Sequence, residues 1–134
     1  MQLADEEMSK ARSVSASDAL LEMQENPEIL LVDVRDAEEV AVTGLGAGAI
    51  NAPGRSIAWK ACREFHEAYR EPQLQDRTRR ILTTCGSSPC YRGASAANLL
   101  TEMGFSDVAY VDGGMAELLV NGLCTDKPVI PAQT

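Results

Sequence analysis

The sequence predicts an α/β domain built on a largely parallel sheet. Strand-like and helix-like segments alternate along the chain. Residues 29–35 form an almost continuous aliphatic run, which is typical of a strand covered on both faces. Shorter runs at 81–84 and 108–111 have a similar character. We therefore expect a central, mostly parallel sheet flanked by helices, with ligands binding at the carboxyl ends of its strands.

The first half of the chain contains clear helix boundaries. The Ser-Ala-Ser-Asp motif at 15–18 is a typical helix start, and Asn-Pro at 26–27 ends the helix. A second, short helix is expected to begin at Asp36. Residues 49–52 are expected to form a short strand, which Pro-Gly at 53–54 breaks.

The second half continues the alternation. Residues 56–69 are predicted to be a partly amphipathic helix and 71–80 a loop. After the strand at 81–84, residues 94–103 are rich in helix formers and stop at Gly104. A last short helix is expected over 115–120.

The length and the ends of the chain suggest one compact domain. With 134 residues, we expect a domain over 13–123, an N-terminal arm or helix over 1–12 and an extended tail over 124–134. No apolar run has the length of a membrane span, and residue 1 is not followed by a secretory leader pattern. We therefore expect a cytoplasmic protein with reduced thiols.

Charge and cysteine spacing exclude several partners. The net charge of −8 argues against binding to nucleic acid or an anionic membrane, although small anions remain possible. The cysteines have unrelated spacings and the single histidine offers little help as a ligand, so we expect no metal and no cofactor. The cysteines are Cys62, Cys85, Cys90 and Cys124, and the histidine is His66.

One cysteine stands where the predicted strand 81–84 leads into the predicted helix 94–103. Gly86, Ser87 and Ser88 follow Cys85, and their small side chains leave its sulfur accessible. Backbone N–H groups and the positive end of the helix can converge at such a turn and stabilise an anion. We therefore predict that Cys85 has a lowered pKa and is nucleophilic near neutral pH, with simple packing as the alternative.

Two charged residues end the predicted strand at 29–35. Asp33 and Arg35 lie at the carboxyl end of this strand, where catalytic groups are often found. Buried groups of this kind more usually tie loops together through hydrogen bonds to the backbone. We therefore predict a supporting role for both.

In order and spacing, several motifs together resemble the single-domain rhodanese family over roughly residues 13–123. They are Asp33-Val34-Arg35, Gly-Ala-Ile-Asn-Ala-Pro at 48–53, the loop from Cys85 to Arg92, the helix motif at 96–105 and Val-Asp-Gly-Gly-Met at 111–115.

The resemblance implies a three-layer sandwich and sulfurtransferase activity. A loop cysteine of this family takes a sulfane sulfur from a donor such as thiosulfate, becomes a persulfide and passes the sulfur to cyanide or a thiol. By similarity Cys85 is the catalytic nucleophile and Arg92 ends the active loop, while Asp33 and Arg35 match supporting positions. The expected substrate-binding residues are Gly86, Ser87, Ser88, Cys90, Tyr91 and Arg92.

The loop departs from the family pattern in length. The usual rhodanese loop has four residues between cysteine and arginine, and the related cell-division-cycle phosphatases have five, whereas Cys85 and Arg92 enclose six. Pro89 removes one N–H donor, and Gly93 stands where the family commonly has serine. The alternatives are therefore a cysteine-dependent phosphatase or arsenate reductase, and a non-enzymatic sulfur carrier or regulatory module.

The loop contains a second cysteine. Cys90 is close enough in sequence to act as a resolving thiol that attacks a persulfide or sulfenate on Cys85. The alternative is that Cys90 fills space beneath the loop. Cys62 and Cys124 are expected to be bystanders, the first in a helical segment and the second near the tail.

Overall fold

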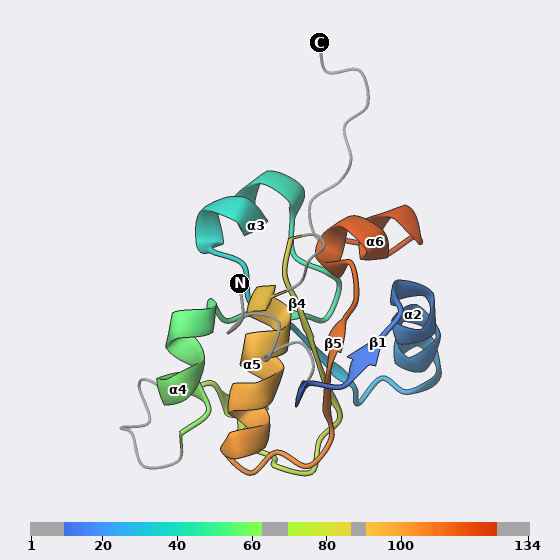
Figure 1. Cartoon of the computed structure of the whole chain (residues 1–134). Coiled ribbons are helices and arrows are strands. Elements are labelled where there is room, and N and C mark those ends of the chain that lie inside the picture. The colour runs from blue at the N-terminus through green and yellow to red at the C-terminus, as the bar shows by residue number, and fades with distance from the viewer. Residues whose placement is uncertain (1–9, 63–69, 87–90, 126–134) are drawn as a thin grey trace.

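A parallel sheet forms the middle of the computed structural model, which describes residues 10–62, 70–86 and 91–125 (Figure 1). The strand order is β1-β5-β4-β2-β3, and every neighbouring pair is parallel. The predicted α/β class with a mostly parallel sheet is thus confirmed, and β4 lies in the centre. The strands are β1 (Ser13–Val14), β2 (Leu30–Asp33), β3 (Ile50–Asn51), β4 (Ile81–Thr84) and β5 (Val108–Val111).

Helices cover the sheet on both sides. In Figure 1, α4 and α5 lie on one side of the strands, and α2 and α6 pack together on the other. α3 follows β2 in the chain, so it begins at the carboxyl edge of the sheet. The helices are α2 (Ala16–Glu25), α3 (Ala37–Thr43), α4 (Ile57–Lys60), α5 (Tyr91–Glu102) and α6 (Gly114–Val120), with 3₁₀ turns at Gly54–Ser56 and Pro72–Leu74.

Two hydrophobic clusters hold the three layers together. Successive side chains of a strand point to opposite faces, so each central strand contributes to both clusters. Burial on both faces explains why these strands are aliphatic throughout. The α5 side buries Leu30, Val32, Ile81, Val108 and Tyr110 with Ala94, Ala97 and Leu100, and the α2 side buries Leu31, Leu82, Ala109 and Val111 with Ala19, Met115 and Leu118.

Helix ends follow the local sequence signals. The Ser15 hydroxyl accepts a hydrogen bond from the Asp18 N–H at 3.1 Å, so it caps α2 as predicted. α3 begins after Asp36, whose N–H donates to the Glu39 carboxylate at 3.0 Å. Gly104, with φ of 103°, adopts the left-handed conformation that follows many helices.

The middle of the chain differs from the sequence prediction. The helix expected over 56–69 ends at Lys60, and Cys62 therefore lies beyond α4 rather than in a helix. Residues 63–69 lie outside the described residues. The loop predicted at 71–80 contains the turn Pro72–Leu74, which buries Leu74.

Both ends of the domain also show contacts that local patterns did not predict. The two-residue strand β1 pairs with Tyr110 and Val111 of β5. Part of the expected tail is attached to the domain, because Ala47 N–H donates to the Cys124 carbonyl at 2.8 Å and Thr125 forms an antiparallel bridge with Gly46. Residues 1–9 and 126–134 lie outside the described residues.

Candidate active site

Cys85 follows the central strand directly, at the carboxyl edge of the sheet. Its side chain is only 2% exposed and belongs to the cluster on the α5 side. Cys85 is disulfide-bonded, while Cys62 and Cys124 are free. The structure thus describes an oxidised form in which Cys85 is covered by its neighbours, so the expected accessible sulfur and reduced thiol are both wrong for this form.

The backbone N–H groups that we predicted to converge near Cys85 belong only in part to the described residues. Ser87, Ser88 and Cys90, all predicted substrate-binding residues, lie outside them. Gly86, Tyr91 and Arg92 are described, and the latter two open α5. α5 starts at Tyr91 rather than at the predicted position 94, which places Arg92 in its first turn.

The backbone at Cys85 is held by the start of α6. Met115 N–H donates to the Cys85 carbonyl at 2.6 Å, and Ala116 N–H donates to the Gly86 carbonyl at 2.9 Å. Gly114 makes this approach possible, because a Cβ at that position would lie 2.4 Å from the Cys85 carbonyl oxygen. Its φ of +61° also favours glycine. Gly114 therefore fixes where Cys85 sits, a role that the sequence motif alone did not reveal.

The other end of the loop is attached to the sheet through α5. The Thr83 hydroxyl donates to the Gly93 carbonyl at 2.7 Å, and both residues are buried. Gly93, which replaces the family's common serine, therefore packs inside the domain. This contact fixes the first turn of α5, and with it Arg92, relative to β4.

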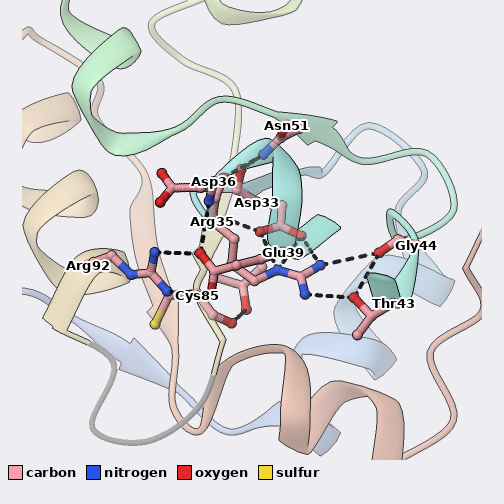
Figure 2. A network of polar contacts seen from close by, with 10 residues as sticks. Asp33, Arg35, Asp36, Glu39, Thr43, Gly44, Asn51, Cys85 and Arg92 are labelled. Atoms are coloured by element: carbon pink, nitrogen blue, oxygen red, sulfur yellow. Dashed lines mark hydrogen bonds and ion pairs between the residues drawn. The ribbon is translucent and has the colours of Figure 1, made fainter. Parts of the chain in front are cut away.

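Arg92 forms a two-pronged ion pair with Glu39 of α3 (Figure 2). The two terminal nitrogens of Arg92 donate to the two carboxylate oxygens at 2.8 and 3.1 Å. The hydrogen bond from Arg92, aided by the one from Asp36 N–H, lowers the pKa of Glu39 from 4.5 to about 2. The Glu39 hydrogen bond in turn raises the pKa of Arg92. Sequence analysis missed Glu39, for which the only local signal was its place in a capping box.

The stability contributed by Glu39 is expected to disappear in acid. A lowered pKa in the folded protein stabilises it above about pH 4.5, and this stabilisation is lost as the pH falls toward 2. Since both side chains are almost half exposed, at 48% and 41%, we expect Glu39→Gln to cost less than about 1 kcal/mol at pH 7. Urea unfolding from pH 7 to pH 2.5 checks this. The difference in free energy of unfolding between the wild type and Glu39→Gln should shrink below pH 4.5. A difference that stays constant with pH would contradict the lowered pKa of Glu39.

Asp33 and Arg35 form a buried ion pair with several further contacts. Arg35 Nη2 lies 2.7 Å from Asp33 Oδ2, and its Nε donates to the same carboxylate at 3.0 and 3.1 Å. The guanidinium also donates to the Thr43 hydroxyl at 2.7 Å and the Gly44 carbonyl at 3.2 Å. Asn51 Nδ2 donates to the carbonyls of Asp33 and Arg35 at 2.8 and 2.9 Å. The network joins β2 to β3 and to the end of α3 (Figure 2), and the supporting role of Asp33 and Arg35 stays a prediction.

The described ranges show neither a membrane-length helix nor a metal-binding group. No helix there combines the length and apolar character needed to span a bilayer. No cluster of three or more histidine, cysteine, aspartate or glutamate residues there is arranged to hold a metal ion.

A family model, the rhodanese-like domain, matches residues 16–120. Among solved structures, a protein of unknown function from Rhodopseudomonas palustris, described as a possible tyrosine phosphatase, superposes with a TM-score of 0.79 at 22% identity over 92% of this chain and 90% of that one. The rhodanese-like domain of an Anabaena protein gives 0.67 at 23% identity, over 91% and 83%. A rhodanese-related protein from Thermoplasma volcanium gives 0.61 at 25%, over 84% and 95%. No curated protein is significantly similar in sequence.

Proposed function

Because the chain belongs to the rhodanese-like domain family, we propose that it is a sulfurtransferase whose Cys85 carries the transferred sulfur as a persulfide. The supporting observation is the place of Cys85 at the carboxyl end of β4, with Arg92 in the first turn of the helix that follows. Ligands of parallel α/β sheets bind at this edge. The donor is thiosulfate or a persulfide, and the acceptor is cyanide or a thiol.

The proposed cycle begins from reduced Cys85. Two thiol groups of the acceptor class reduce the disulfide: the first forms a mixed disulfide with the protein, and the second attacks it, releases the Cys85 thiolate and leaves the two acceptor sulfurs joined as one disulfide. The Cys85 thiolate then attacks the outer sulfur of thiosulfate, the sulfur–sulfur bond of the donor breaks, and sulfite leaves with the electron pair. An acceptor thiolate attacks the outer sulfur of the Cys85 persulfide, takes that sulfur as its own persulfide and returns the Cys85 thiolate.

The cycle also favours a location. Thiols stay reduced in the cytoplasm, whereas oxidising compartments would retain the Cys85 disulfide. We therefore place the protein in the cytoplasm, with small sulfur compounds rather than nucleic acid or membranes as its partners.

Incubation of the reduced protein with thiosulfate tests the proposal. We expect the intact mass to rise by about 32 mass units, the mass of one sulfur, and to return when a thiol is added, because the thiol removes the outer sulfur of the persulfide. Peptide mass should place the added sulfur on Cys85. Unreduced protein is the control and should gain nothing. A reduced protein that also gains nothing contradicts the proposal.

A cysteine-dependent phosphatase is the second candidate. It is favoured by the six-residue loop between Cys85 and Arg92. The likeness to the possible tyrosine phosphatase, at 22% identity, shows the fold alone. Against it, the loop between Cys85 and Arg92 contains no carboxylate to protonate a leaving group. Turnover of an aryl phosphate by the reduced protein would favour this candidate. A non-enzymatic carrier would instead keep a stable Cys85 persulfide without turnover.

A further inference from the structure

The positive charge of Arg92 is already paired in this structure. Glu39 contacts both terminal nitrogens of the guanidinium, so the edge of the group formed by Nη1 and Nη2 is occupied. An arginine at the end of an anion-binding loop attracts oxyanions through its charge and its paired N–H donors. The Glu39 carboxylate gives Arg92 the negative charge and the two hydrogen-bond acceptors that such an oxyanion would otherwise provide.

The ion pair lies next to the residue that follows Cys85. A Cβ at Gly86 would lie 3.8 Å from Nη2 of Arg92 and 3.8 Å from Oε2 of Glu39. The Glu39 carboxylate is therefore beside the reacting edge of the domain as well as beside Arg92 (Figure 2). A carboxylate beside Gly86 repels an anion that approaches Cys85, even where the anion uses another edge of the guanidinium.

We infer that Glu39 is a specificity-determining residue that weakens binding of divalent oxyanions at the Cys85 edge by occupying and neutralising Arg92. The inference deepens the proposed function and rests on it for the site. Thiosulfate must displace Glu39 or bind beside its charge, and a donor with less negative charge meets a smaller penalty. A phosphate or arsenate dianion meets the same penalty as thiosulfate.

Replacement of Glu39 by glutamine separates this effect from helix capping. Glutamine keeps an oxygen that can accept the Asp36 N–H hydrogen bond, now 3.0 Å long, but it removes the negative charge. Glu38→Gln is the matched control. It makes the same change of charge one residue earlier in the first turn of α3, on an exposed side chain.

Protection by sulfate measures anion affinity without any turnover. The reduced wild type, Glu39→Gln and Glu38→Gln are alkylated with neutral iodoacetamide at rising sulfate, with ionic strength held constant by chloride. Peptide mass gives the alkylation rate of Cys85. We expect the sulfate concentration for half protection to fall by about threefold to tenfold in Glu39→Gln and to stay within about twofold in Glu38→Gln. The KM for thiosulfate should fall in parallel with the sulfate midpoint.

Three results would overturn the inference. They are equal sulfate midpoints in the wild type and Glu39→Gln, weaker protection in Glu39→Gln, and no protection of any variant by sulfate. Weaker protection would mean that Glu39 orients Arg92 for anions instead of competing with them. Since sulfate carries no transferable sulfane sulfur, the protection assay stands even where sulfur transfer from thiosulfate fails. Failure of the proposed function is therefore distinguishable from failure of this inference.

Discussion

Cys85→Ser is expected to abolish sulfur transfer from thiosulfate. A serine hydroxyl is not ionised near neutral pH, and its oxygen cannot hold a sulfane sulfur as a persulfide. We expect the rate of thiocyanate formation from thiosulfate and cyanide to fall by more than about a thousandfold, because the proposed cycle passes entirely through this sulfur. The gain of one sulfur in intact mass should disappear as well.

Two other cysteines provide the controls. Cys62 and Cys124 are free in the structure, and neither follows a strand of the sheet. Cys62→Ser and Cys124→Ser are therefore expected to keep the wild-type rate and the persulfide on Cys85. Wild-type turnover by Cys85→Ser would rule out this residue as the sulfur carrier and would remove the proposed mechanism.

Gly114→Ala is expected to destabilise the domain and to displace Cys85. The added Cβ would meet the Cys85 carbonyl oxygen at 2.4 Å and its carbonyl carbon at 3.0 Å, and the residue would have to keep a φ of +61°. Backbone atoms cannot move aside as a flexible side chain can. We expect the free energy of unfolding to fall by about 2–4 kcal/mol, measured by urea denaturation, and the transfer rate of the remaining folded protein to fall.

Gly122→Ala is the matched control for backbone strain. Gly122 also has a positive φ, of +102°, but a Cβ there would meet nothing within 4 Å. Its substitution should cost about 1 kcal/mol through conformation alone and leave the transfer rate unchanged. Equal losses of stability and activity in the two variants would show that the close approach of Gly114 to Cys85 contributes nothing beyond the positive φ.

The sequence predicted those parts of the fold that depend on neighbouring residues. The aliphatic run at 29–35 contains β2, and the signals at Ser15 and Asp36 begin α2 and α3 as expected. These elements are determined by local hydrophobic pattern and by side chains that cap the adjacent backbone. Their order along the chain was enough to predict the parallel sheet.

Features that depend on distant residues were not predicted. β1 has only two residues and exists because β5 offers an open edge for pairing. The Glu39–Arg92 contact joins residues 53 positions apart, and Gly114 approaches Cys85 from the next strand–helix unit. Such contacts follow from the packing of elements, and no pattern within a short window encodes them.

The two attachments of the loop between Cys85 and Arg92 have a consequence for how this fold can diversify. The carbonyls of Cys85 and Gly86 are bonded to the backbone of α6, and the Gly93 carbonyl is bonded to Thr83 in β4. The segment between these attachments can therefore lengthen or shorten while the scaffold on either side stays in place. We expect an insertion there to change the chemistry available near Cys85 without disturbing the fold, because the folding of the domain depends on residues outside this segment.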